Sequence, residues 1–324
     1  MLKKTLALAA TAALSLGALA GCAASAASEA PDAPAAPTVD EVTVTYVTAP
    51  LNVPSITERE IGAFADAFGD GVDVSYSELT TGPEQTAALA SGDIQFLFAV
   101  GATSVILSAA NGADIAIVDM YSRSPEAFML VSEADGPTSP AELVGRTVAG
   151  PKGTILHELL LAYLASDGYT ADDIDFVDMT IPDAQAALAG GSVDVALLAG
   201  PAAATMLADG YQKVTDGSGL VGATIVVATT REFAEANPAI VRTLRDAHRS
   251  VLDYMDAHPD EVVAMAAAET ELPEAAVRDM AAMYDFDAEI TDSDIAAMSA
   301  TVDFMVANGM IEEAIDVESL ILPE

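Results

Sequence analysis

Apolar residues recur along the chain in patterns that predict short strands alternating with helices. Residues 42–47 and 72–77 alternate apolar and polar positions, whereas residues 57–68 carry apolar side chains at helical spacing. The same rhythm predicts a helix at 84–90, a strand at 94–99, a helix at 102–110 and a strand at 115–119. Strands separated by helices predict a mostly parallel sheet with helices on both faces.

A second series of elements follows in the same order. It comprises strands at 147–149, 174–177, 193–198 and 211–214 and helices at 155–166, 183–189 and 202–208. Residues 88–101 (ALASGDIQFLFAVG) align without a gap with residues 187–200 (ALAGGSVDVALLAG), an interval of 99 that pairs Gly101 with Gly200. Chance similarity of alanine-rich segments is the alternative. The matched glycines and prolines favour two related α/β lobes.

The last third of the chain is predicted to be helical after a strand at 223–228. Helices at 238–256, 260–269, 273–284 and 293–307 carry apolar stripes with acidic residues outside. We expect these helices to pack back on the first lobe. The predicted domains are therefore lobe 1 at 41–122, lobe 2 at 127–219, and a return to lobe 1 at 224–322.

The N-terminus has the pattern of a secretory signal. Lys3 and Lys4 precede an apolar run at 6–19, which ends in Leu19-Ala20-Gly21-Cys22. This segment resembles the lipobox of bacterial lipoproteins, which implies that residues 1–22 are a signal peptide and that Cys22 carries a diacylglyceryl anchor and palmitate. An ordinary signal peptide or a membrane helix is the alternative. Residues 23–40, rich in Ala, Ser, Pro and acids, predict a disordered tether.

Composition narrows the classes of function. The chain has 12 Lys plus Arg against 50 Asp plus Glu, a net charge of -38, and lacks the basic footprint that nucleic acid needs. A single Cys excludes an internal disulfide framework and a thiolate metal cluster. We therefore expect no nucleic-acid partner, no metal site and no cofactor.

Enzyme motifs are incomplete. His157 and Glu158 begin like HExxH, but position 161 is Leu, so the second metal ligand is missing. Residues 145–152 resemble a Walker loop only superficially, and the chain has no G-x-S-x-G sequence. The sequence predicts a protein that is not an enzyme.

Helix starts supply the candidate ligand site. Ligands of open α/β sheets collect beyond the carboxyl ends of strands, where helix N-termini offer unpaired N–H groups and partial positive charge. Four such starts lie at 50–57, 101–104, 152–157 and 200–203. Their predicted ligand-binding residues are Leu51, Asn52, Ser55, Gly101, Ala102, Thr103, Ser104, Gly153, Thr154, Ile155, His157, Gly200 and Pro201. Simple helix caps are the alternative for the Gly, Ser and Thr positions, and a solvent-facing ring is the alternative for His157.

Arg123 is the candidate for pairing an anionic ligand, because a guanidinium forks onto carboxylate or sulfonate. A hinge salt bridge to one of the many acids is the alternative. Tyr121 and Phe128 are the nearby aromatic residues that would stack on a planar heterocycle.

Residues 41–322 resemble the substrate-binding proteins of bacterial ABC importers, in the group that binds nitrate, taurine, aliphatic sulfonates and thiamine precursors. The resemblance rests on the paired ALxxG segments, on TSPAELVGRTVAGPKGT (138–154) and on YDFDAEITDSDIAAMSATVDFMVANGMI (284–311). It implies a two-lobed, type II periplasmic-binding-protein-like fold with parallel-sheet lobes, joined by a hinge that crosses near 122–127 and 219–224.

The resemblance also implies a function. We expect a monomeric extracytoplasmic lipoprotein on the outer face of the cell membrane that delivers a small molecule to ABC permease subunits. Apolar and hydrogen-bonding residues at the helix starts favour a small organic anion such as a sulfonate or carboxylate. The alternatives are a pyrimidine thiamine precursor and a lipid-anchored sensor or scaffold that binds a protein.

Overall fold

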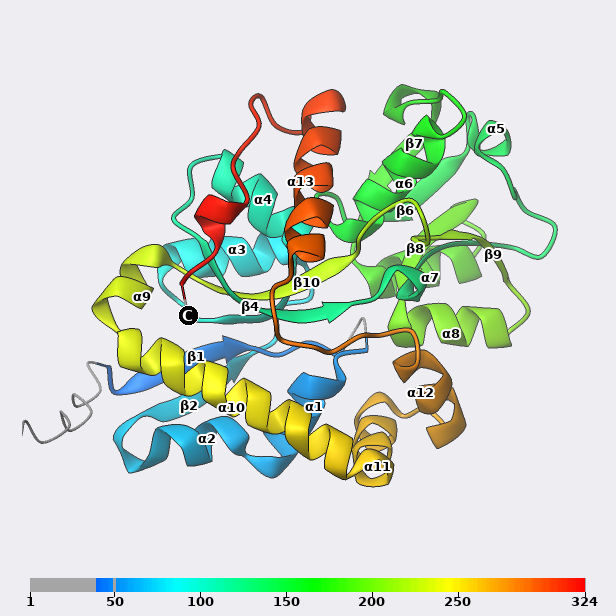
Figure 1. Cartoon of the computed structure of the whole chain (residues 1–324). Coiled ribbons are helices and arrows are strands. Elements are labelled where there is room, and N and C mark those ends of the chain that lie inside the picture. Colours follow the sequence, from blue (N-terminus) through cyan, green and yellow to red (C-terminus); the bar gives the residue numbers. More distant parts are fainter. Residues whose placement is uncertain (1–38, 49–50, 324) are drawn as a thin grey trace, which may run out of the picture. The chain divides into compact units, whose positions relative to one another are not determined.

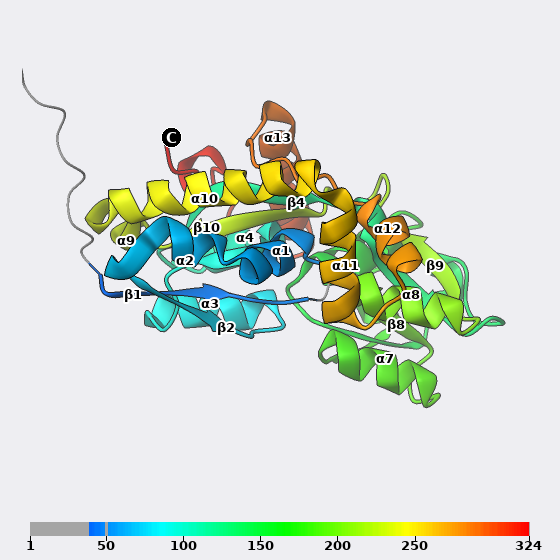
Figure 2. The ribbon, with the colours of Figure 1, turned by 90° about the horizontal axis from the view of Figure 1, so that it is seen from below.

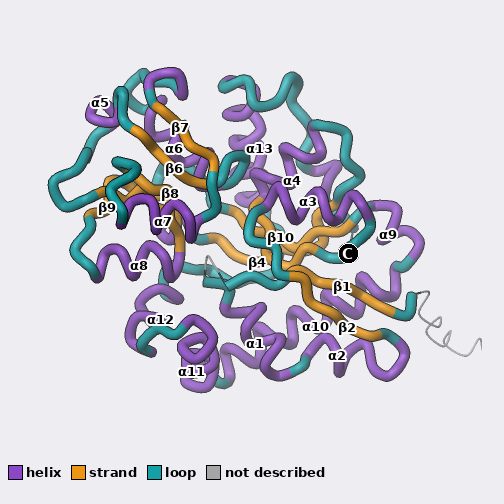
Figure 3. The backbone as a smooth tube through the Cα atoms, turned by 180° about the vertical axis from the view of Figure 1, so that it is seen from behind, coloured by secondary structure: helices purple, strands orange, loops and turns teal. Residues whose placement is uncertain are grey.

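The structure is a computed structural model that describes residues 39–48 and 51–323, in which strands form sheets of two, three and five strands. An isolated bridge joins the sheets of two and three strands, and we call these together the first sheet and the five-stranded one the second sheet. All of these residues belong to one unit, residues 36–324. The predicted signal peptide, Cys22 and most of the predicted tether lie outside the described residues. Figure 3 shows the strands in two groups with helices around them.

The first sheet has the strand order β2-β1-β3-β10-β4. A parallel bridge from Val44 to Phe96 joins the parallel pair β1 and β2 to the other three strands. Strand β10 runs antiparallel to both of its neighbours, β3 and β4. The strands are β1 (Glu41–Thr45), β2 (Asp73–Ser77), β3 (Leu97–Gly101), β4 (Ala116–Arg123) and β10 (Thr224–Thr229).

The second sheet has the equivalent order β7-β6-β8-β5-β9. Strand β6 is parallel to β7 and β8, whereas β5 is antiparallel to β8 and β9. The strands are β5 (Phe128–Ser132), β6 (Thr147–Gly150), β7 (Asp175–Asp178), β8 (Val195–Ala199) and β9 (Gln212–Asp216).

Each sheet departs from the expected parallel arrangement at one strand. Strand β10 begins at Thr224 opposite Arg123, where β4 ends, so it must run back along β4. Strand β5 likewise begins at Phe128 opposite Ala199, where β8 ends. Both reversed strands follow the connections predicted to cross between lobes, and these connections meet through a bond from Ser124 N–H to the carbonyl of Ala223 (3.3 Å).

The helices between β1 and β4 pack around the first sheet. The predicted helix at 57–68 begins earlier and is divided at Gly62, whose φ of 68° lies in the left-handed region. The helices are α1 (Val53–Ile61), α2 (Ala63–Phe68), α3 (Gly82–Ser91) and α4 (Ala102–Ala110), with a short 3-10 turn, η1 (Gly69–Gly71).

The second sheet has a similar set of helices. They are η2 (Pro125–Ala127), α5 (Pro140–Leu143), α6 (Ile155–Ala165), η3 (Ala171–Asp173), α7 (Ile181–Ala189) and α8 (Gly200–Ala208). Gly101 caps α4 at the end of β3, and Gly200 is the first residue of α8 after β8. Both glycines therefore lie at the strand-to-helix junction that the interval of 99 predicts. The division into lobes with the predicted boundaries stays a prediction.

The C-terminal helices contact mainly elements of the first sheet. Helix α10 lies along α1 and α2, and α13 packs on α4 and β10 (Figures 1 and 2). Helix α12 also touches α8 beside the second sheet. These helices are α9 (Arg231–Ala236), α10 (Pro238–Ala257), α11 (Pro259–Thr270), α12 (Glu274–Ala281) and α13 (Asp292–Ala307), followed by η4 (Glu318–Leu320). Among the described residues, no helix has the length and apolar character that a membrane span requires.

Candidate ligand-binding cleft

A cleft lies between elements of the two sheets, with about 550 Å³ of empty space when the part open to solvent is included. Its wall consists of strand ends, the loop before α3 and helix starts. We call the elements that pack with the first sheet and those that pack with the second sheet the two sides of the cleft. The lining residues are Val47, Asn52, Thr80, Thr81, Gly82, Gln85, Ala99, Gly101, Ser104, Phe128, Pro151, Thr154, Ile155, Leu156, Ile181 and Ile225. None of these described residues carries a charged or titratable side chain, so the wall offers only neutral polar groups and apolar surface.

Five helices begin at this wall: α1, whose N-cap is Asn52, and four others. Gly82, Ile155 and Ile181 are the first residues of α3, α6 and α7, and Gly101 is the N-cap of α4. The first N–H groups of a helix have no partner within the helix and carry partial positive charge. The wall can therefore receive the oxygens of an anion without a basic side chain.

Side-chain caps differ among these four helices. Thr81 caps α3 and Thr180 caps α7 by accepting from backbone N–H groups. Helices α4 and α6 have no side-chain cap, and the Thr154 hydroxyl donates instead to the carbonyl of Pro151 (2.8 Å). The starts of α4 and α6 therefore keep donors for a ligand.

The two sides approach closely at these starts. A Cβ on Gly101 would lie 3.1 Å from Cδ1 of Ile155, so glycine allows this contact without displacement of the isoleucine. The Ser104 hydroxyl donates to the carbonyl of Gly153 (2.9 Å). Ala99, at the same wall, has a φ of 80°, a left-handed conformation that costs energy for any residue with a Cβ.

Two buried amides of the cleft wall lack a partner for their oxygen. Asn52 donates from Nδ2 to the carbonyl of Val47 (2.9 Å), and Gln85 donates from Nε2 to the carbonyl of Leu79 (3.1 Å). These bonds fix the orientation of each amide. The oxygens Asn52 Oδ1 and Gln85 Oε1 are buried and accept no hydrogen bond. Such unpaired buried acceptors are uncommon, because desolvation without a partner is costly.

The structure brings together part of the predicted site. Asn52, Gly101, Ser104, Thr154 and Ile155 line the cleft. The other predicted positions are not among its lining residues: Leu51, Ser55, Ala102, Thr103, Arg123, Gly153, His157, Gly200 and Pro201. The sequence reasoning missed the starts of α3 and α7. Thr81 and Glu84 form a capping box that marks the start of α3.

Several of these other positions have partners within the protein. Leu51 is buried in an apolar cluster with Ile56, and Ala102 in one with Val105. The hydroxyl of Ser55 is hydrogen-bonded to the hydroxyl of Tyr121 (2.8 Å), which places the buried Tyr121 beside α1. Phe128, the other aromatic candidate, lines the cleft. The lining residues Gly200 and Ala204 belong to a different cavity near α12.

His157 faces the protein interior, so the alternative of a solvent-facing ring is wrong, whereas its role as a ligand donor stays a prediction. The ring is buried and packs on Phe176 with centroids 5.0 Å apart. Burial, together with the nearby charge of Lys152, lowers the pKa of His157 to about 4. The imidazole is therefore neutral at pH 7, and its Nδ1 has no hydrogen-bond partner.

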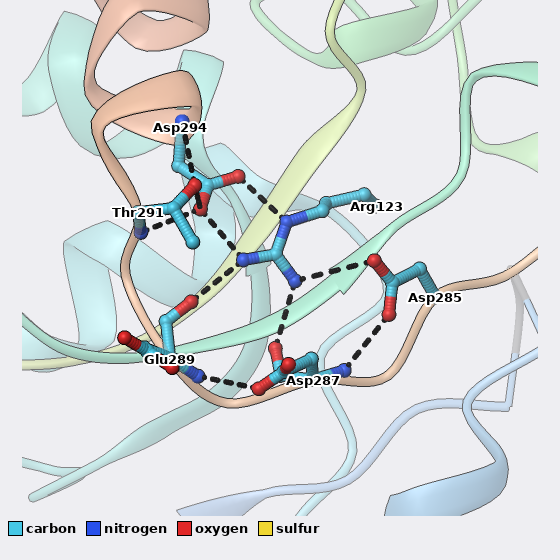
Figure 4. A network of polar contacts seen from close by, with 6 residues as sticks. All are labelled: Arg123, Asp285, Asp287, Glu289, Thr291 and Asp294. Atoms are coloured by element: carbon cyan, nitrogen blue, oxygen red, sulfur yellow. Dashed lines mark hydrogen bonds and ion pairs between the residues drawn. The ribbon is translucent and has the colours of Figure 1, made fainter.

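Arg123 takes part in an ion-pair network at the end of β4 (Figure 4). Its Nε and Nη2 donate to the two oxygens of Asp294 at 2.6 Å each. Nη1 donates to the carbonyl of Asp287 (2.9 Å), and Nη2 also donates to that of Glu289 (2.6 Å). The Asp285 carboxylate lies 3.7 Å from Nη1. These contacts match the alternative left open by the sequence, a salt bridge beside the crossing segment.

The Arg123–Asp294 pair stabilises both charges. Burial alone would raise the pKa of Asp294, but hydrogen bonds from Arg123 and Thr291 outweigh it, so the pKa lies below its ordinary value. The same pair raises the pKa of Arg123 although burial opposes this shift. Arg123 and Asp285 also exchange two backbone hydrogen bonds of 2.8 and 2.9 Å. The guanidinium therefore holds the 285–294 segment against β4.

The chain belongs to the NMT1/THI5-like family, whose model matches residues 53–262. It is 33% identical over 171 residues to a putative aliphatic sulfonates-binding protein of Escherichia coli, a match that covers 52% of this chain and 53% of that protein. It is 28% identical over 224 residues to the taurine-binding periplasmic protein of Escherichia coli, covering 68% of each. The first match thus spans about half of the relative's length.

Solved structures of binding proteins share the fold. The alkanesulfonate-binding protein SsuA from Xanthomonas axonopodis pv. citri, bound to MOPS, superposes with a TM-score of 0.80 at 22% identity, over 87% of this chain and 98% of that one. The periplasmic aliphatic sulphonate binding protein SsuA of Escherichia coli gives 0.74 at 22% identity, over 87% and 97%. The predicted periplasmic-binding-protein fold and the resemblance to this group are confirmed.

An enzyme also adopts this fold. The desulfurization enzyme DSZB superposes with a TM-score of 0.66 at 19% identity, over 88% of this chain and 97% of that one. The fold by itself therefore does not separate binding proteins from enzymes. The two sequence relatives, by contrast, are both binding proteins.

Proposed function

We propose that the protein binds a small organic sulfonate in the cleft and delivers it to an ABC importer. The observation that carries this proposal is a cleft without charged side chains, at which the uncapped N-termini of α4 and α6 meet. The names of the relatives support the same ligand class.

Neutral donors suit a sulfonate. Backbone N–H groups at a helix start form charge-assisted hydrogen bonds with an anion, and such bonds are roughly twice as strong as neutral ones. The backbone at Ser104 and at Thr154 adds polar groups from opposite sides of the cleft, whereas the Ser104 hydroxyl already donates to Gly153. A ligand contacted by both sides would favour their approach, which is the basis for proposing that two lobes close around it.

The apolar part of the wall supports an aliphatic substituent. Val47, Phe128, Leu156, Ile181 and Ile225 contribute apolar surface to the cleft. Burying a methylene group there gains about 0.8 kcal/mol. An alkanesulfonate therefore matches the wall better than an inorganic anion of the same charge.

An aminosulfonate such as taurine is the second candidate ligand. The unpaired oxygens Asn52 Oδ1 and Gln85 Oε1 belong to residues of the cleft wall, and an ammonium group would supply the donors they lack. Satisfying two buried acceptors would favour taurine over ethanesulfonate, which has the same chain length but no amine.

The proposed site of action is the outer face of the cell membrane. The lipobox-like sequence ending at Cys22 supports a lipid anchor, and residues 23–40 would serve as the tether. Replacing Cys22 by Ser should release the protein from the membrane fraction without changing ligand affinity. Membrane retention of this variant would contradict the anchor.

A thermal-shift experiment with the purified full chain tests the proposed function. The panel contains ethanesulfonate, taurine, sulfate, acetate and an aminopyrimidine. A ligand at 100 times its Kd stabilises by about 2.7 kcal/mol, so a sulfonate that binds should raise Tm by several degrees. Stabilisation by the pyrimidine alone, or by no compound, would contradict the sulfonate assignment, and the latter would favour a sensor or scaffold.

A further inference from the structure

A buried carboxylate joins three helices beside the cleft. Glu158, on α6, accepts hydrogen bonds from the hydroxyls of Thr103 on α4 (2.6 Å) and Thr301 on α13 (2.8 Å). Relative exposure is 5% for Glu158, 2% for Thr103 and 7% for Thr301. None of the three lines the cleft. We call this arrangement the Glu158 contact.

The helices of the Glu158 contact belong to different sheets. Helix α6 packs on β5 and β8 of the second sheet, whereas α4 and α13 pack on β10 of the first. Helices α4 and α6 contact each other directly, and α13 lies beside α4 (Figure 1). The contact therefore spans the same boundary as the cleft, and it forms only where the two sides meet.

The Glu158 carboxylate depends on its two hydroxyl partners. Burial raises the pKa of Glu158, while the bonds from Thr103 and Thr301 act in the opposite direction. A buried carboxylate that loses a donor bears an uncompensated desolvation cost. The two threonines therefore stabilise the arrangement in which α6 touches α4 and α13. They have no such effect when the sides are apart and water solvates the carboxylate.

We propose that Glu158 and Thr301 determine ligand affinity without touching the ligand, by stabilising the closed arrangement of the two sides. This inference rests on the proposed function, because it assumes that a ligand in the cleft selects the closed arrangement. A group that stabilises only the closed arrangement increases the closed population of the ligand-free protein. The apparent ligand affinity then rises by the same factor as that population. Glu158 and Thr301 are thus positioning residues.

Thr301→Val tests the proposal with little change of side-chain shape. A hydrogen bond to a charged group contributes enough that its loss should weaken ethanesulfonate binding about tenfold. Glu158→Ala should weaken binding at least as much, and Glu158→Gln should restore most of the affinity because its amide can both accept from and donate to threonine hydroxyls. Ser299→Ala is the matched control: its hydroxyl lies on α13 and donates to the carbonyl of Ile295.

A distance measurement reads the closed arrangement directly. Spin labels at Glu313→Cys, in the segment between α13 and η4, and Asp167→Cys, just after α6, report the separation of the two sides in the full chain carrying Cys22→Ser. Both positions are exposed. The distances are recorded without ligand and with saturating ethanesulfonate. Thr301→Val should reduce the short-distance population about tenfold relative to the long one, whereas Ser299→Ala should leave it unchanged.

Two results would overturn the proposal. One is a short-distance population that survives in Thr301→Val and Glu158→Ala at the wild-type level. The other is a wild-type protein that binds ethanesulfonate in a calorimetric titration but never shows a short distance, since the Glu158 contact would then not form. A failure of the sulfonate assignment looks different, because ethanesulfonate would then change no distance while the ligand-free comparison between variants still decides the role of Glu158.

Discussion

The cleft and the Arg123 network handle charge in opposite ways. Arg123 and Asp294 form a charged pair with two bonds of 2.6 Å, and the arginine is committed to partners within the protein. The cleft, proposed to receive an anion, has no charged side chain among its lining residues. A full charge thus serves to hold a segment in place, and partial charges of helix starts serve to bind and release a ligand.

Breaking the charged region should have the largest effect. Arg123→Ala leaves the buried Asp294 carboxylate without its main partner. Loss of one member of a buried ion pair costs about 3 kcal/mol of folding free energy when the lost member was partly exposed. Arg123 is 19% exposed, so the lower end of the usual range applies. Urea denaturation should show this loss, while ethanesulfonate affinity at low denaturant should change less than threefold.

The pH dependence of stability provides the control for Arg123→Ala. In wild type, the lowered pKa of Asp294 contributes stability above the ordinary value of 3.8, and this is lost as pH falls through the lower folded value. In the variant, only the hydrogen bonds from Thr291 still offset burial, so the pKa of Asp294 is lowered less and the carboxylate contributes less stability at neutral pH. The stability difference should therefore be largest near pH 7 and narrow below 3.8. A difference independent of pH would contradict the ion-pair role.

Adding a charge to the neutral cleft wall should weaken ligand binding strongly without destabilising the fold. Thr154 is the N-cap of α6, and Asp at this position would cap its N–H groups and add a negative charge to the cleft wall. We expect Thr154→Asp to be at least as stable as wild type and to bind ethanesulfonate about 100-fold more weakly.

Thr154→Asn separates the two effects of that substitution. The amide also caps the helix but adds no charge, so its binding loss should be clearly smaller. Calorimetric titration of both variants provides the comparison. Equal loss in the two variants would mean that occupied donors, rather than repulsion, explain the effect. Unchanged binding in both would remove the start of α6 from the site.

The smallest expected effect concerns the acidic surface. The net charge of -38 creates a negative field that opposes the approach of any anion. Salt screens this field, so the association rate of ethanesulfonate should rise about threefold or more between 10 and 150 mM salt. Stopped-flow measurements should show this rise with little change in the dissociation rate. A falling association rate would indicate that positive charge guides the ligand.

Local pattern was sufficient for most of the fold. The strands and helices around Gly101 and Gly200 are marked by apolar periodicity and by glycine and proline positions. Strand β5, with the sequence FMLVS, was not predicted, because this short run follows directly on the predicted crossing segment. The reversal of β5 and β10 depends on where the crossing segments enter each sheet, which local sequence does not encode.

The candidate site was only partly predictable. The starts of α1, α4 and α6 were expected at the cleft and line it. The start of α8 was also expected but is not among the lining residues, and the starts of α3 and α7 were missed. Asp294, which pairs with Arg123, lies 171 residues away in sequence, among many other acids. The excess of acidic residues predicts that an arginine of this chain pairs with a carboxylate. Only the tertiary structure identifies which carboxylate it is.

A crystal structure of the full chain with ethanesulfonate would test the central claim most directly. We predict that the sulfonate oxygens lie about 2.9 Å from backbone nitrogens at the starts of α4 and α6. The ethyl group should then contact the apolar wall near Leu156 and Ile225, with Arg123 still paired to Asp294. A sulfonate bound instead to the Arg123 guanidinium, or located outside the cleft, would contradict the account.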